Sequence, residues 1–253
     1  MEVLIHDSAE EATVVAAAAI ARLLADKPDA VLGLATGNTM LALYRQLVRL
    51  HRQEGLDFSR VTTFNLDEYV GLDPQHPDSY HRFMREHLFD LVNIDLRATH
   101  IPDGQAQDMS QACADYERAI ERAGGIDLQL LGIGRNGHIG FNEPSSSLAS
   151  RTRVTPLAAQ TLKDNRCHFH QEPMPSSAIT MGIGTIMQAR RCLLLAFGEA
   201  KAEAVAQAAE GPVTAMVPAS ALQFHPACQF LLDHPAASKL HNQAFYASQR
   251  AES

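Results

Sequence analysis

Short apolar runs alternate along the chain with longer segments in which apolar residues recur every three or four positions. A short apolar run is typical of a strand that is buried on both faces, whereas the wider spacing is typical of a helix with one buried side. The runs predict strands at residues 3–5, 30–34, 61–65, 128–132, 192–197 and 228–232. Because helical segments separate these strands, the pattern predicts an α/β fold built on a mostly parallel sheet.

Start and stop signals support the helices between these strands. Ser8 and Glu11 have the capping-box spacing in front of an alanine-rich segment, and Gly55 follows the helical segment at 40–54, where it is expected to end the helix. Similar spacing predicts helices at 110–123 and 200–209. The strands and helices therefore alternate in the manner of repeated βα units.

Composition and charge limit the domain count and the partners. The chain has 253 residues and 46% of them are hydrophobic, enough for one full core, so residues 1–253 are predicted to form a single domain. A formal net charge of -8 disfavours broad contact with nucleic acid or an anionic membrane, because both need clustered Lys and Arg. The N-terminus lacks the pattern of a secretory signal, and no apolar run has the length of a membrane span. We therefore expect a soluble, cytoplasmic protein.

The cysteines and histidines show no metal-binding pattern. The four cysteines are widely spaced without a CxxC pair, which favours buried free thiols in a reducing compartment over a zinc site or a disulfide framework. His168 and His170 form an HxH pair with no further ligand at metal spacing. We expect no bound metal.

The first stretch with chemical groups after a predicted strand is GLATGNTM, from Gly33 to Met40. Ligands of such sheets bind where loops leave the carboxyl ends of the strands. Gly37 lets the backbone approach a ligand, while Thr36, Thr39 and the amides at the helix start can surround an anion with donors. The Walker and GxGxxG patterns are both missing, so neither a nucleoside triphosphate nor a dinucleotide is indicated. The alternative is an ordinary glycine turn with a threonine cap.

The second stretch, TTFNLDEYVGL, places Asp67 and Glu68 at the end of an apolar strand. A carboxylate there can be partly desolvated, which raises its pKa and suits it to act as a general base. Neighbouring residues of a strand point to opposite faces, so at most one of the two is expected to face a site. A turn-stabilising or helix-capping role is the alternative.

The third stretch is GIGRNGHIGFNEP, which follows the apolar run at 128–132. A simple turn needs one or two glycines, but this stretch combines four glycines with Asn136, His138 and Glu143. A histidine that moves protons needs a partner on its second ring nitrogen, and either Asn136 or Glu143 can accept that hydrogen bond. The stretch therefore predicts a functional histidine.

These three stretches, in this order and spacing, resemble the glucosamine-6-phosphate deaminase (isomerase) family, as do AITMGIGTIMQARRCLLLAFGEAKAEAV and PASALQFHP. The resemblance covers nearly the whole chain, and FNLDEYVGL and NGHIGFNEP are specific to the family. It implies a Rossmann-like, doubly wound α/β fold with helices on both faces. It also implies the conversion of glucosamine 6-phosphate and water to fructose 6-phosphate and ammonia, a step of amino sugar catabolism, with no metal, nucleotide or other cofactor.

The resemblance also implies roles for single residues. Asp67 matches the carboxylate that moves a proton from C2 to C1, His138 matches the group that opens the sugar ring, and Glu143 matches the residue that assists and orients it. Asn136 stands where the allosteric branch of the family has Asp, although another branch also has Asn. The implied phosphate site consists of Thr36, Gly37, Asn38, Thr39 and Lys201, with Arg166 as a second cation whose alignment needs a gap.

Other activities are compatible with parts of this pattern. Galactosamine 6-phosphate differs from the glucosamine compound only at C4, so the sequence leaves the preferred amino sugar open. The 6-phosphogluconolactonases share the fold and a glycine-histidine loop, but there the histidine precedes a pattern resembling SLFPG, whereas this chain has GFNEP and keeps Asp67. Non-catalytic sugar-phosphate sensor domains follow a DNA-binding helix-turn-helix, and here the first predicted strand already begins near Val3.

The regulation implied by the resemblance depends on the branch of the family. N-acetylglucosamine 6-phosphate activates the allosteric branch by binding between subunits. Ser146 and Arg153 match two of its contacts, but Thr155 stands at the position of an effector-binding lysine, and the longer C-terminal tail is missing after Ser253. A threonine cannot replace a positive charge beside a phosphate. The chain therefore resembles the shorter, non-allosteric branch, and formation of a homo-oligomer stays open.

Overall fold

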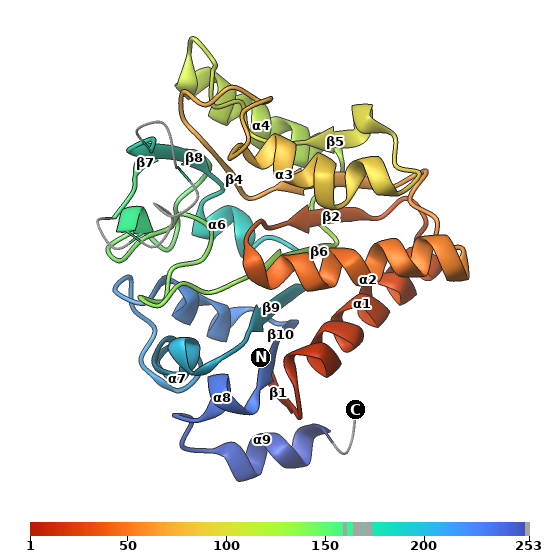
Figure 1. The fold of residues 1–253 in the computed structure, drawn as a ribbon. Coiled ribbons are helices and arrows are strands. Elements are labelled where there is room, and N and C mark those ends of the chain that lie inside the picture. The colour runs from red at the N-terminus through yellow and green to blue at the C-terminus, as the bar shows by residue number, and fades with distance from the viewer. Residues whose placement is uncertain (159–160, 164–168, 170–173, 251–253) are drawn as a thin grey trace.

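Seven strands of the computed structural model form one parallel sheet in the order β1, β10, β9, β6, β2, β3, β5 (Figure 1). The structure describes residues 1–250 except 159–160, 164–168 and 170–173. The strands of this sheet are β1 (Glu2–His6), β2 (Val31–Leu34), β3 (Thr62–Asn65), β5 (Thr99–His100), β6 (Leu128–Leu131), β9 (Cys192–Ala196) and β10 (Cys228–Asp233). The six predicted strands are confirmed, each to within one residue at either end.

Helices cover both faces of this sheet, with α1, α2 and α3 on the near side in Figure 1 and α4 behind it. The described helices are α1 (Ala9–Asp26), α2 (Asn38–Glu54), α3 (Tyr80–His87), α4 (Met109–Arg122), α6 (Ile183–Ile186), α7 (Ala202–Glu210), α8 (His234–Ala237) and α9 (Gln243–Arg250), with 3-10 helices η1 (Phe89–Leu91), η2 (Leu96–Ala98), η3 (Glu199–Lys201) and η4 (Pro218–Phe224). Ser8 caps α1, since its hydroxyl accepts a hydrogen bond from Glu11 N (3.1 Å). α2 ends at Gly55, whose φ of 74° is left-handed. The doubly wound α/β fold is therefore confirmed.

A second, smaller sheet lies beside the first and was not predicted. It is antiparallel, in the order β4 (Asp67–Tyr69), β8 (Ser177–Thr180), β7 (Arg153–Pro156). Only Leu66 separates β3 from β4, so the chain passes from one sheet to the other next to Asp67. In the register of this sheet, Asp67 lies opposite Thr180.

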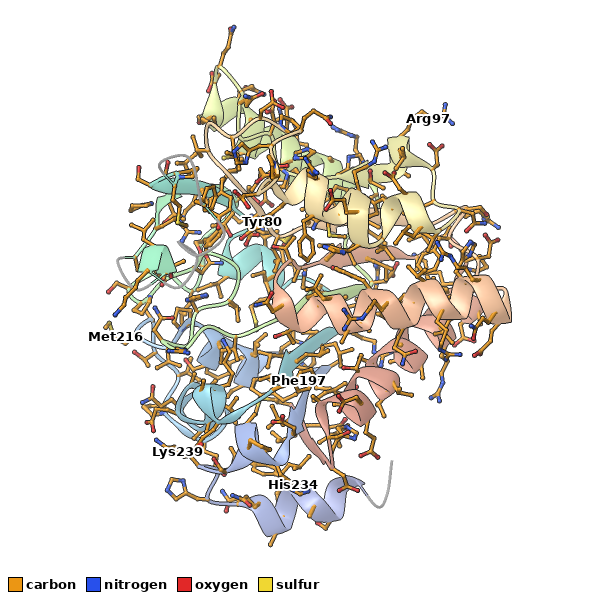
Figure 2. All side chains as sticks on the ribbon, in the orientation of Figure 1. Tyr80, Arg97, Phe197, Met216, His234 and Lys239 are labelled. Atoms are coloured by element: carbon orange, nitrogen blue, oxygen red, sulfur yellow. The ribbon has the colours of Figure 1, made fainter. Side chains whose placement is uncertain are left out.

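The apolar runs are continuous because helices cover the sheet on both faces, so the residues of β2, β6 and β9 are buried throughout. Side chains fill the space between the layers (Figure 2). Cys113, Cys192 and Cys228 are buried free thiols, and Cys167 lies outside the described residues. No helix in the described part of the chain is long and apolar enough to cross a membrane.

Candidate active site

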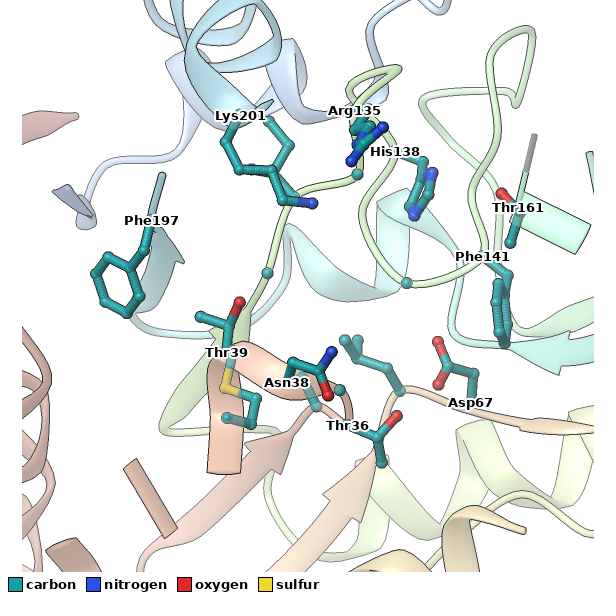
Figure 3. A pocket seen from close by; sticks show the side chains of 18 of the residues that line it. Thr36, Asn38, Thr39, Asp67, Arg135, His138, Phe141, Thr161, Phe197 and Lys201 are labelled. Atoms are coloured by element: carbon teal, nitrogen blue, oxygen red, sulfur yellow. The ribbon is translucent and has the colours of Figure 1, made fainter. Parts of the chain in front are cut away.

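A cavity of about 580 Å³ opens at the carboxyl ends of β2, β3, β6 and β9, where sheets of this kind place their ligand sites. It is lined by Ala35, Thr36, Gly37, Asn38, Thr39, Met40, Leu66, Asp67, Tyr80, Gly132, Ile133, Gly134, Arg135, His138, Gly140, Phe141, Thr161, Phe197, Ala200 and Lys201. Figure 3 shows Asp67 and His138 toward one side of this cavity and Lys201 and Thr39 toward the other. The three sequence stretches with chemical groups therefore meet in one place.

One end of the cavity offers donors to an anion. The chain enters α2 through Gly37, whose φ of 107° lies in the region that favours glycine. No side chain caps the first turn of α2 within the described residues, so the first amides of the helix, before Met40 N bonds to Gly37 O, and the positive end of the helix dipole can serve a ligand. Lys201 reaches the same end from η3, at the carboxyl end of β9 (Figure 3). Arg166 lies outside the described residues, as do His168 and His170.

A buried carboxylate shapes the turn that leads to Lys201. Both carboxylate oxygens of Asp233, at the end of β10, accept a hydrogen bond from Gly198 N at 3.0 Å. Gly198 has a φ of 83°, and η3 begins at the next residue. Asp233 also caps α8 by accepting from Ala236 N (2.8 Å). It therefore links two neighbouring turns behind the anion-binding end of the cavity.

Asp67 lines the cavity, whereas Glu68, its neighbour on β4, does not. Asp67 is buried, with only 6% of its surface exposed. Burial, and then the negative charge of Glu68, raise the pKa of Asp67 to about 8. A carboxyl group that titrates near neutral pH can take up a proton and give it back.

His138 is oriented by two polar side chains. Its Nδ1 lies 2.6 Å from Asn136 Oδ1 and 3.4 Å from Glu143 Oε2. Because amide and carboxylate oxygens accept hydrogen bonds, Nδ1 carries the hydrogen and Nε2 keeps its lone pair when the ring is neutral. His138 is therefore arranged to take a proton on Nε2.

Glu143 and Asn136 form the support behind the His138 ring. Glu143 accepts hydrogen bonds from Thr161 Oγ1 and from Asn136 Nδ2, the latter at 2.8 Å. Burial by itself raises the pKa of Glu143, but the hydrogen bond and charge of His138, with those from Thr161 and Asn136, lower it to about 2. The ionised Glu143 can stabilise positive charge on the ring, and the Asn136 amide bridges the two because it both donates and accepts.

Two residues that the sequence did not single out also line the cavity. Tyr80 projects from the start of α3, and its ring is stacked on Phe141 with centroids 6.1 Å apart. Arg135 lies within the glycine-rich loop, and Figure 3 shows it beside His138. The sequence feature that could have indicated Arg135 is its position beside Asn136 and His138 in the glycine-rich loop. Tyr80 had no local signal, because tertiary structure brings it to Asp67.

Together, the parallel sheet and the cavity at its carboxyl edge define a Rossmann-like α/β protein with a polar small-molecule site. Residues 5–229 match the profile of glucosamine-6-phosphate isomerases/6-phosphogluconolactonases. The chain belongs to this family.

Several relatives that match this chain over nearly its full length are glucosamine-6-phosphate deaminases. The protein of Hahella chejuensis is 53% identical over 247 residues, which cover 97% of this chain and 94% of that protein. The protein of Shewanella woodyi is 50% identical over 253 residues, which cover 100% of this chain and 96% of that protein. These matches confirm the family that the sequence motifs indicated.

Solved structures agree with this assignment. A monomeric glucosamine-6-phosphate deaminase is 46% identical and superposes with a TM-score of 0.92, covering 94% of this chain and 100% of that chain. The 6-phosphogluconolactonase of Trypanosoma brucei superposes with a TM-score of 0.72 at 21% identity, covering 94% and 98% of the two chains. At that identity the lactonase shares the fold alone.

Proposed function

We propose that this protein converts glucosamine 6-phosphate and water to fructose 6-phosphate and ammonia. The observation that carries the proposal is one cavity in which Asp67 and His138 lie toward one side, while Lys201 and the start of α2 offer donors at the other. Relatives at 50% and 53% identity that are glucosamine-6-phosphate deaminases support the same activity.

The substrate phosphate binds at the start of α2 in this proposal. Residues 36–39 supply hydroxyl, amide and backbone donors, and Lys201 supplies a positive charge. Arg135 is the second cation that lines the cavity among the described residues. Binding this unreactive group holds C1 and C2 within reach of the groups that move protons, so phosphate binding contributes to the rate.

His138 opens the sugar ring in this mechanism. Nε2 takes the proton of the C1 hydroxyl and returns one to the ring oxygen, which breaks the C1–O5 bond and gives the free aldehyde. Glu143 stabilises the imidazolium while it carries the proton, and Asn136 holds the ring in place. The product of this step is the open-chain amino sugar.

Gly134 should prove necessary for this orientation of His138. A Cβ atom at position 134 would lie 2.1 Å from His138 Cε1, so Gly134→Ala must displace the ring. We expect kcat for ammonia release to fall about tenfold to a hundredfold with an intact fold, because small misplacements of a reacting group are costly. Steady-state rates and circular dichroism check this expectation. An unchanged kcat would contradict the close contact between Gly134 and the catalytic ring.

Asp67 moves the proton from C2 to C1 in the open-chain form. The neighbouring carbonyl makes the C2 proton acidic, so Asp67 can remove it to give an enolamine and then deliver a proton to C1. The C1 carbonyl oxygen takes up a proton from the ammonium group of the substrate as the enolamine forms, so that protonation of C1 by Asp67 gives the protonated imine of fructose 6-phosphate with a C1 hydroxyl. A single carboxyl group serves both carbons, and its pKa of about 8 suits it to be base first and acid second.

Hydrolysis of the imine completes the reaction. Water adds to C2, the nitrogen takes up a proton and leaves as ammonia, and the C2 oxygen becomes the ketone of fructose 6-phosphate. The nitrogen of the substrate polarises the intermediate in this scheme, so the protein needs only to place groups that move protons. We propose that no metal or organic cofactor takes part.

Ammonia release from glucosamine 6-phosphate and galactosamine 6-phosphate, measured side by side, tests the proposed function. We expect a clear preference for the glucosamine compound. Equal rates or a galactosamine preference would overturn the substrate assignment, and no ammonia from either compound would overturn the activity.

Lys201→Ala is expected to raise KM for the sugar phosphate about tenfold to a hundredfold. The ammonium group contacts the phosphate in ground and transition states alike, so its loss weakens binding by roughly one charge-assisted hydrogen bond. The matched control is Lys239→Ala, because Lys239 lies outside the cavity near α8 and pairs with Glu203 (Figure 2). If KM is the same in parent and Lys201→Ala proteins, Lys201 does not bind the phosphate.

We also expect hyperbolic kinetics and no activation by N-acetylglucosamine 6-phosphate. Arg153 Nη2 donates to Ser146 Oγ (3.1 Å), but Thr155, two residues further along β7, is uncharged where the allosteric branch has a lysine. Without that contact an effector loses much of its preference for one state. Initial rates over a range of substrate concentrations, with and without the effector, decide the matter. A sigmoidal curve that becomes hyperbolic with effector would contradict this expectation.

We propose that one chain suffices for activity and that residues 1–253 form one domain. The cavity draws on segments from Ala35 to Lys201, which supports one domain. The related deaminase at 46% identity is monomeric, which supports activity of a single chain. The three buried free thiols fit a reducing compartment, so we propose a cytoplasmic location.

A further inference from the structure

Glu68 is a buried carboxylate directly beside Asp67 that the mechanism above does not use. It is 1% exposed and lies on β4 without lining the cavity. Its side chain turns toward the first residues of α3. Oε1 accepts hydrogen bonds from Tyr69 N (2.8 Å) and Tyr80 N (3.1 Å), and Oε2 accepts from His81 N (3.1 Å).

The His81 ring adds a fourth contact to Glu68. His81 Nδ1 lies 2.9 Å from Glu68 Oε2 and donates when that nitrogen carries its hydrogen. Every one of these contacts presents a donor to the carboxylate, which is the arrangement that an ionised carboxylate accepts. A buried negative charge is therefore held next to the residue that moves the substrate proton.

The same contacts fix the start of α3. Ser79 caps this helix by accepting a hydrogen bond from Arg82 N (3.1 Å). Glu68 accepts hydrogen bonds from the backbone amides of Tyr80 and His81. The first turn of a helix has amides without partners inside the helix, so these contacts anchor it. Tyr80 begins α3, and its ring then stands against Phe141 in the cavity wall.

We propose that Glu68 is a positioning residue for the reaction: its buried carboxylate sets the charge environment of the neighbouring Asp67, and its hydrogen bonds to the start of α3 place Tyr80 beside Asp67. This inference rests on the proposed function. It assigns two adjacent carboxylates of one strand to different tasks, since Asp67 touches the substrate and Glu68 acts through Asp67 and Tyr80.

Electrostatics around Asp67 support this division. Burial is the largest cause of the raised pKa of Asp67, and the charge of Glu68 is the second. Burial followed by neighbouring groups that include Asp67 also raises the pKa of Tyr80 on α3 and of Tyr116 on α4, so both phenols stay neutral at neutral pH.

The remaining titratable groups lie on other segments of the cavity. Among the described residues that line it, they are His138 and Arg135 in the loop after β6, and Lys201 on η3. Positive charge on any of these three groups would lower the pKa of Asp67 and so oppose the effect of the Glu68 charge. They are the same in parent and variant proteins, so a comparison at Glu68 isolates its contribution.

The test compares Glu68→Gln with the parent over a range of pH. Asp67 must be ionised to remove the C2 proton, so kcat/KM rises as pH increases through the pKa of Asp67 in the free enzyme. Removing a neighbouring negative charge lowers that pKa, so this rise is expected to shift by about one unit to lower pH. The phosphate and amine of the substrate titrate too, but they are identical in every assay.

Glu117→Gln is the matched control. Glu117 is a largely buried carboxylate that accepts from Thr152 N (2.7 Å), Thr185 Oγ1 (2.6 Å) and Arg151, and it does not line the cavity. We expect its pH profile to coincide with that of the parent. If the profile of Glu68→Gln also coincides with the parent, or if Glu68→Gln only loses rate without a shift, the inference is overturned.

Two further measurements keep the test decisive. If Glu68→Gln fails to fold, His81→Gln removes one donor and leaves the carboxylate less screened, so the rise in kcat/KM should move to higher pH instead; no movement would overturn the inference.

In addition, the carboxyl ¹³C signal of Asp67, assigned with Asp67→Asn, reports its titration without any turnover. A lower titration midpoint in Glu68→Gln supports the inference even if the parent releases no ammonia, a result that would count against the proposed function alone.

Discussion

Replacing Asp67 by asparagine is expected to lower kcat about 10⁴-fold, which is the upper end of what a general base contributes. The amide has nearly the shape of the carboxyl group but cannot accept the C2 proton. Binding of the sugar phosphate should stay close to that of the parent, because Lys201 and Thr39 of the proposed phosphate site lie toward the other side of the cavity (Figure 3). Exchange of the C2 proton with deuterated water, followed by NMR together with ammonia release, measures the step directly.

Asp29→Asn is the control for this variant, because Asp29 is exposed and does not line the cavity. We expect it to leave both the exchange and the turnover unchanged. Exchange of the C2 proton at the parent rate in Asp67→Asn would show that another group is the base.

His138→Gln is expected to lower kcat about 10³-fold. Glutamine can still form a hydrogen bond to a sugar hydroxyl, but it cannot carry a proton from the C1 hydroxyl to the ring oxygen. Ring opening then depends on the slow reaction in water. The measurement is steady-state ammonia release over a range of substrate concentrations, with binding of the sugar phosphate determined separately.

The same change at an exposed histidine is the control for His138→Gln. His241 precedes α9 and its side chain is 86% exposed. His241→Gln is expected to behave like the parent. A His138→Gln protein with parental turnover would remove the histidine from the reaction and leave ring opening to the solvent.

The large sheet was predictable because burial on both faces imposes continuous apolar runs. β6 and β9 consist of buried residues only, and both were expected from sequence. The small sheet escaped prediction for physical reasons. β4 is the three-residue segment DEY, which reads as polar, and β7 ends at Pro156. No local pattern marks such strands, because their pairing depends on neighbouring strands and on packing around Tyr69. Tyr69 belongs to an apolar cluster separate from the main core, which also contains Leu72, Phe141, Leu157, Phe169 and Ala178.

The candidate site was partly predictable for a topological reason. The loops that contain Gly37 and His138 follow parallel strands, and such strands end at one edge of the sheet. The hydrogen bonds of Asn136 to both His138 and Glu143 were not predictable, because the sequence is compatible with either Asn136 or Glu143 as the partner of the His138 ring. Tyr80 reaches the cavity through the placement of α3, which depends on contacts between segments far apart in sequence.

The two groups of residues in the proposed mechanism have partly different supports in this fold. The start of α2 and Lys201 extend from strands of the parallel sheet. Asp67 begins a strand of the antiparallel sheet, and the loop of His138 leans on β8 through the bond from Phe141 N to Thr180 Oγ1 (3.1 Å). Changes along the smaller sheet can therefore alter the surroundings of Asp67 and His138 while the proposed phosphate site stays in place.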